Sequence, residues 1–217
     1  MKTDVLMKNS LFKGIKVEEM ESLLHCLHAY CKTYKKEEMI LHHGDKVNHI
    51  GLLLKGTAHI IKDDYWGNRT IIKEVYVGEI FAEAYACIHD KELEVSLLAM
   101  EDCEVMFLDV GAITCMCGQG CRFHQQIIQN LLMITSQKNL LLTQKMEHIS
   151  KRTLRDKILS YLSAQSLKQG AQTISIPFNR QQLADYLSVN RSALSIELSK
   201  MQKEGILKYH KNNFELL

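Results

Sequence analysis

Residues 179–203 read NRQQLADYLSVNRSALSIELSKMQK, and this stretch decides the fold of the C-terminal third of the chain. It predicts one helix beginning after Asn179 and a second beginning after Asn190, because asparagine is a good N-cap. Leu194, Leu198 and Met201 give the second helix a buried stripe. Two short helices joined by such a tight break form a helix-turn-helix.

A short hairpin is predicted at residues 206–217, where it would form a wing beside the helix pair. Arginine and serine on the polar faces of the pair can bond to base edges or phosphates. The candidate DNA-binding residues are Arg180, Gln181, Gln182, Asn190, Arg191, Ser192, Ser195 and Lys200.

Charge supports a polyanionic partner for this part of the chain. Residues 150–217 hold 11 Lys+Arg and 5 Asp+Glu, a net of +6, although the whole chain carries only +2. Charge alone would equally fit a solvated lysine-rich surface. Together with the helix pair and the wing, it favours binding to a double-stranded DNA operator.

A long helix without glycine or proline is predicted between residues 122 and 150. One row of its residues alternates four- and three-residue steps, as in a heptad seam. This seam consists of Ile128, Leu132, Thr135, Asn139, Leu142, Met146 and Ile149. A second row lies beside it: Phe123, Ile127, Leu131, Ile134 and Leu141. We expect the second row to pack on its own domain and the seam to form a homodimer, the alternative being one wide core face in a monomer.

Residues 30–109 have a different sequence pattern from the predicted long helix. Short apolar runs in this region are separated by glycine and by charged turns. Such a pattern predicts a compact antiparallel sandwich or barrel. The fold class is therefore α+β, with an N-terminal antiparallel sandwich or barrel, a long dimerisation helix and a C-terminal winged helix-turn-helix. The expected boundaries are 1–121 for the sensor domain with its N-terminal helices, 122–150 for the dimer helix and 151–217 for the DNA-binding domain.

The glycine pattern adds a family resemblance. Gly44, Gly56 and the segment GEIFAE at residues 78–83 resemble the β-roll and phosphate-binding cassette of the Crp/Fnr family of bacterial transcription regulators. Residues 180–203 resemble its helix-turn-helix. The resemblance implies that the N-terminal domain is a jelly-roll-like β-roll that senses an effector. It also implies a dimeric regulator of transcription that binds operator DNA, with RNA polymerase as a further partner.

The chain departs from that family where a cyclic nucleotide would bind. Cassettes that bind it carry an Arg followed by Ser or Thr, and these positions are Leu93 and Glu94 here. A cyclic phosphate needs a cation and hydroxyl or amide donors, so we expect no useful binding of cyclic AMP and leave the effector unidentified. The candidate effector pocket comprises Gly78, Glu79, Phe81, Ala82, Glu83, Leu93 and Ser96.

The recognition helix departs from the family too. The family often has Glu at Ser192 and Arg at Ile196, so its usual operator sequence is not expected. Glu197 occupies a place that is commonly apolar, and Ser188 replaces a frequent turn glycine.

A thiol cluster provides an alternative function. Cys115, Cys117 and Cys121 are close enough in sequence to hold zinc or an iron–sulfur cluster, to sense redox state or to be inert. Their spacing matches no strong metal-binding pattern. The alternative is therefore a thiol- or metal-based sensor module in which DNA binding is secondary.

Other classes are excluded by the composition and motifs. The 46% hydrophobic content is that of a globular protein, and no apolar stretch is long enough to cross a membrane. Seven cysteines without an export signal predict a cytoplasmic protein. No P-loop, nucleophile elbow or zinc-protease motif occurs, so we expect no enzyme.

Overall fold

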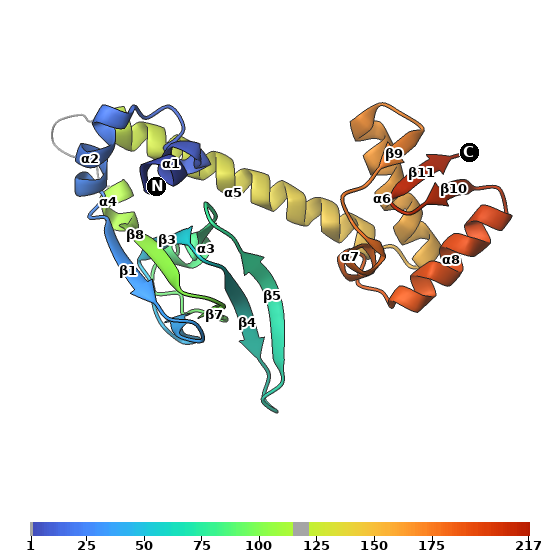
Figure 1. The fold of residues 1–217 in the computed structure, drawn as a ribbon, viewed down its shortest axis with the longest axis horizontal. Helices are drawn as coiled ribbons and strands as arrows, with labels where there is room; N and C mark the ends of the chain where they lie inside the picture. The colour runs from blue at the N-terminus through green and yellow to red at the C-terminus, as the bar shows by residue number, and fades with distance from the viewer. Residues whose placement is uncertain (1, 115–121) are drawn as a thin grey trace. The chain divides into compact units, whose positions relative to one another are not determined.

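The computed structural model describes residues 2–114 and 122–217. It divides into two compact units, Met1–Ser136 and Gln137–Leu217 (Figure 1). Helix α5 (Arg122–Ile149) contributes residues to both units.

The first unit contains two four-stranded antiparallel sheets, with strand orders β1-β8-β3-β6 and β2-β7-β4-β5. The strands are β1 (Tyr30–Tyr34), β2 (Met39–Leu41), β3 (His49–Lys55), β4 (Ala58–Asp63), β5 (Arg69–Val75), β6 (Ile80–Phe81), β7 (Ser96–Ala99) and β8 (Cys103–Asp109). Buried side chains of both sheets, such as Leu53, Val105 and Leu97, form one core cluster. The predicted jelly-roll-like fold is confirmed.

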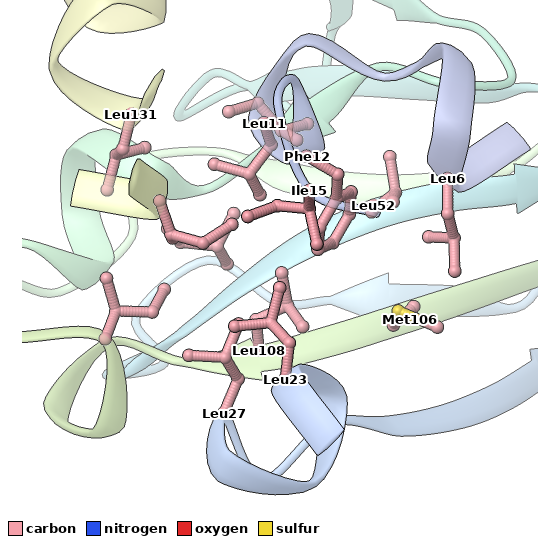
Figure 2. Close-up of a cluster of buried hydrophobic side chains, with 14 of the residues drawn as sticks. Leu6, Leu11, Phe12, Ile15, Leu23, Leu27, Leu52, Met106, Leu108 and Leu131 are labelled. Carbon is pink, nitrogen blue, oxygen red and sulfur yellow. The ribbon is translucent and has the colours of Figure 1, made fainter. Parts of the chain in front are cut away.

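The sheet with β3 is buried on both faces. Side chains alternate along a strand, so Leu53 joins the core shared by the sheets while Leu52 and Leu54 join a second cluster on the outer face. Figure 2 shows this second cluster, in which Leu52 and Leu108 of the sheet meet side chains of the helices. Those helices are α1 (Lys2–Lys8), η1 (Ser10–Phe12), α2 (Val17–Cys26), α4 (Val110–Thr114) and α5.

Gly51 permits a close approach inside the β-roll. A Cβ atom at this position would lie 2.1 Å from the ring of Phe81, on the paired strand β6. The Phe81 ring can therefore occupy its position only because residue 51 is a glycine.

The second unit has its own core. Helix α6 (Leu154–Gln169) is followed by β9 (Thr173–Ser175), α7 (Arg180–Tyr186), α8 (Arg191–Lys203), β10 (Leu207–His210) and β11 (Asn213–Leu216). The three strands form an antiparallel sheet of order β10-β11-β9. The predicted stripe of Leu194, Leu198 and Met201 is fully buried in the core of this unit, together with Tyr161 and Phe214.

Among the helices within residues 2–114 and 122–217, none is both long enough and apolar enough for a bilayer crossing.

Candidate DNA-binding and effector sites

Two asparagines set the start of the helices in the helix-turn-helix. The Asn179 side chain accepts a hydrogen bond from the Gln182 backbone N–H at 2.9 Å, and the Gln182 side chain accepts one from Asn179 in return. The Asn190 side chain accepts a bond from the Ser192 N–H at 2.8 Å. These bonds satisfy N–H groups that a helix leaves open at its first turn, so the sequence fixes both helix starts locally.

The turn between the helices contains a left-handed residue. Ser188 has φ +54°, in the region that glycine adopts most readily. This position is the one where the family pattern has a frequent glycine. The serine keeps the turn at a modest conformational cost.

The candidate DNA-binding residues are not equivalent. Arg191, Ser192 and Lys200 are exposed on α8, whereas Ser195 is half-buried and donates its hydroxyl to the Arg191 carbonyl at 3.0 Å. No hydrogen bond or ion pair with another described residue occupies the Arg191 guanidinium, so it is free to meet a phosphate or a base. Gln181 bonds to Asp185 at 2.8 Å.

Arg180 lies against the wing. Its guanidinium is 5.0 Å from the ring centre of Tyr209 on β10 and 5.7 Å from that of Phe214 on β11. The two rings stack on each other at 5.9 Å. Burial lowers the pKa of Arg180 from its usual high value. Arg180 therefore joins α7 to the wing, a contact that sequence spacing did not reveal.

Glu197, which stands where an apolar residue is common, has a specific partner. Its carboxylate accepts a 2.7 Å bond from Arg155 of α6, and the same guanidinium holds Glu204 in a two-pronged contact. The bonds with Glu204 and Glu197 raise the pKa of Arg155 above its usual value. The acidic residue is thus compensated by an arginine 42 residues earlier, and the two helices are held together.

The last turn of α5 packs on an aromatic cluster of the second unit. His148 is 5% exposed, and its Nδ1 lies 2.8 Å from the Ser160 hydroxyl. Its ring contacts Tyr161 edge-on at 5.8 Å and Tyr186 at 6.2 Å. Burial lowers the pKa of His148, and it raises the pKa of Tyr161 to about 12.

A small pocket opens in the β-roll at the place predicted for the effector. It encloses about 320 Å³ of empty space, part of it continuous with solvent. The lining residues are Leu41, Ile60, Phe81, Ala82, Tyr85, Leu93, Val95, Ser96 and Leu97. The lining is almost entirely apolar, and no charged side chain belongs to it.

Four of the seven predicted pocket residues line this space: Phe81, Ala82, Leu93 and Ser96. The other three lie outside the lining. Gly78 forms the turn before β6, where its N–H donates to the Leu53 carbonyl. Glu79 pairs with Lys73 at 3.0 Å, and Glu83 is buried at the start of α3 (Glu83–Ala86).

The charged residue beside the pocket is also paired. Glu94 is exposed and accepts a hydrogen bond from Lys91, which holds the pKa of the glutamate below its usual value. Glu94 does not line the pocket. Of the two positions that differ from the family pattern, Leu93 and Glu94, only Leu93 therefore lies in the pocket lining.

The two rows of α5 differ in exposure. Ile127 and Leu131 are buried in the cluster of Figure 2, with Phe123 and Ile134 partly buried against it. The second row thus packs on its own unit as expected, except for Leu141, which is exposed. In the seam, Ile128 is 40% exposed and Leu132 is 65% exposed. Leu142 and Met146 are exposed as well.

The predicted thiol cluster of Cys115, Cys117 and Cys121 lies outside the described residues. Within the part of the chain that the structure describes, no group of three or more His, Cys, Asp or Glu could hold a metal ion. Cys26 and Cys31 are exposed, and Cys103 is buried.

A β-roll with a small apolar pocket and a winged helix-turn-helix are the two parts expected of a DNA-binding transcription regulator. The Cyclic nucleotide-binding domain family matches residues 31–119, and the Crp-like helix-turn-helix domain family matches residues 156–217. The chain belongs to the Crp/Fnr family of DNA-binding transcription regulators.

Solved structures agree on the fold. The Thermus thermophilus catabolite activator protein shares 19% identity over 96% of this chain and 94% of that chain, with a TM-score of 0.51. The regulator CLP of Xanthomonas campestris shares 19% identity over 93% and 99%, with a TM-score of 0.55. CprK, solved in complex with OCPA, shares 13% identity over 92% and 89%, with a TM-score of 0.63. No curated protein sequence matches the chain.

Proposed function

We propose that this regulator acts as a homodimer and responds to a small, largely apolar effector bound in the β-roll pocket, rather than to cyclic AMP. The effector would change how α5 presents the two copies of α8 to successive major-groove faces of an operator. The observation that carries the proposal is the pocket lining, in which Leu93 stands where a cyclic phosphate would need a cation.

The pocket chemistry favours an uncharged ligand body. Eight of the nine lining residues present aliphatic or aromatic surface. Two hydroxyl groups belong to the lining residues, that of Tyr85 and that of Ser96, and the Ser96 hydroxyl accepts a 2.9 Å bond from the His43 N–H. Desolvating a phosphate here without a charged partner would cost several kcal/mol, on the order of the penalty for any unpaired buried ion. An apolar ligand gains from the same surface.

Calorimetric titration tests the ligand class directly. We expect no heat from cyclic AMP at concentrations up to the millimolar range and no shift in thermal unfolding. Micromolar binding would contradict the proposal.

The occupant can be sought by mass spectrometry of the denatured protein purified from cells. Val95→Phe, which fills the pocket, should abolish a co-purified apolar molecule. Leu98→Phe is the matched control because Leu98 lies on β7 without lining the pocket. Retention of the molecule by Val95→Phe would place its site elsewhere.

The dimer proposal rests on the exposed seam of α5. Four of its apolar members are exposed to solvent in the single chain. An exposed apolar row at heptad spacing is typical of a helix that packs on a partner helix. Leu132→Asp should yield monomers, because it puts a charge in a dry interface. Light scattering measures the mass. Gln137→Asp is the control, since Gln137 is exposed on the opposite side of the helix. If the Leu132→Asp variant is still a dimer, the seam of α5 is not the dimer interface.

A further inference from the structure

One apolar side chain stands on the outward face of α8. Ile196 is 58% exposed, and it points away from the stripe of Leu194, Leu198 and Met201 that buries the helix. With 100° per residue, Ile196 falls near the centre of the exposed face. An exposed β-branched residue here contributes nothing to the core, so its use has to be sought in what the helix meets.

The surroundings of Ile196 are small, polar or basic. Ser192 and Lys200 lie one turn away on either side, and Ser199 and Lys203 complete the face. The Ser199 hydroxyl already donates to the Ser195 carbonyl at 2.9 Å, so it can only accept from a ligand.

This arrangement fits a polyanion with one apolar spot on its surface. The region 150–217 has a net charge of +6, and Arg191, Lys200 and Lys203 are exposed on the same helix as Ile196. An apolar protein partner would need a wider patch than one isoleucine flanked by lysines. The charge and the small serines suit the major groove, which admits an α-helix.

The thymine C5 methyl is the apolar group that base edges present in the major groove, where the other groups are hydrogen-bond donors and acceptors. Ile196 has no hydrogen-bonding atom in its side chain. We propose that Ile196 contacts the methyl group of a thymine in each operator half-site and so specifies an A·T pair there. This inference rests on the proposed function, because it requires α8 to enter the groove.

The experiment begins with selection of binding sites from a random duplex pool at low salt by the full-length protein, once with its co-purified molecule retained and once after that molecule has been removed. We expect an enriched site whose half-sites contain a fixed thymine. Replacing that thymine by uracil removes only the methyl group and leaves the pairing unchanged. It should weaken binding about fourfold for each half-site, the value of one buried methyl group.

Variants assign the methyl contact to Ile196. Ile196→Ala should bind the thymine and uracil duplexes equally well, and Ile196→Arg should shift the selected base at that position to guanine. Leu167→Ala is the matched control, because Leu167 is an exposed leucine on α6 and should keep the preference for thymine. Thermal unfolding checks that each variant is folded.

The outcomes separate the two proposals. Failure to enrich any sequence would refute operator binding itself, and the role of Ile196 with it. An enriched site at which uracil binds as well as thymine in every position would overturn the role of Ile196 alone. A thymine preference that persists in Ile196→Ala would do the same.

Discussion

The two units satisfy their buried polar side chains in different ways. In the first unit, Asn130 of α5 is 2% exposed and donates to the carbonyls of Leu11 and Lys13, each at 2.8 Å. Its own oxygen accepts from Gln126 at 3.1 Å. Asn9 donates to the Gly78 carbonyl and accepts from the Leu11 N–H. In both asparagines, the side-chain amide nitrogen donates a hydrogen bond and the side-chain oxygen accepts one.

In the second unit, the buried polar groups near the end of α5 are held mainly by ring contacts. His148 has one short contact with Ser160, and its other neighbours are the rings of Tyr161 and Tyr186. The Tyr161 hydroxyl is the only buried side-chain group within the described residues that lacks a hydrogen-bond partner. Lys145 lies over the Tyr186 ring at 5.6 Å.

Hydrogen bonds are directional, whereas stacked and edge-on rings tolerate small rotations. We infer that the start of α5 is fixed to the β-roll more rigidly than its last turn is fixed to α6 and α7. The fixed end is also joined to the turn before β6, because Asn9 links the Gly78 carbonyl to Leu11, and Asn130 links Leu11 to α5.

The largest effect should come from the first unit. Asn130→Ala removes both donors from the Leu11 and Lys13 carbonyls and should lower the free energy of unfolding by about 2–3 kcal/mol. Urea denaturation followed by circular dichroism measures it.

Gln126→Ala is the matched control for Asn130→Ala. It loses a single bond to the same amide from a half-exposed position, so its cost should stay below about 1 kcal/mol. Equal losses in the two variants would show that the asparagine does not fix α5.

Local rules explain how much of the second unit could be predicted. Asn179 and Asn190 cap their helices as expected, and the buried stripe of α8 follows from residues three and four apart. The Arg155–Glu197 pair was not predicted, because its partners lie far apart in sequence and only the fold brings them together.

The lining of the β-roll pocket was predicted only in part for the same reason. The cassette motif located Phe81, Ala82, Leu93 and Ser96, which are close in sequence. The opposite walls come from Leu41 on β2 and Ile60 on β4, and the pairing of those strands decides that they face the cassette. Strand register is a tertiary property, and no motif in the chain encodes it.

A smaller effect is expected from pH acting on the second unit. Burial and Lys151 lower the pKa of His148, while Glu147 raises it. The folded state therefore resists protonation, and the unfolded chain takes up the proton near pH 6.5. Stability should be complete above pH 6.5 and fall below it, by at most about 1.4 kcal/mol per pH unit.

His148→Gln isolates this contribution from the other nine histidines. Glutamine can still bond to Ser160 but does not titrate. Urea denaturation at pH 7.5 and pH 5.5 should show that the wild type loses about 1 kcal/mol more than the variant. Identical losses would mean that His148 is protonated in the folded protein without cost, and that the last turn of α5 is held more loosely than its burial indicates.

The smallest effect concerns the Tyr161 hydroxyl. Because this group is buried without a partner, Tyr161→Phe removes a desolvated oxygen and leaves the ring contacts with Phe178 and Tyr186 in place. The free energy of unfolding should rise by about 0.5–1 kcal/mol. Tyr186→Phe is the control, since Tyr186 is half-exposed, and it should change stability by less than about 0.5 kcal/mol. If Tyr161→Phe destabilises the protein instead, the hydroxyl has a partner in solution, and the second unit is tied to α5 by directional bonds as the first unit is.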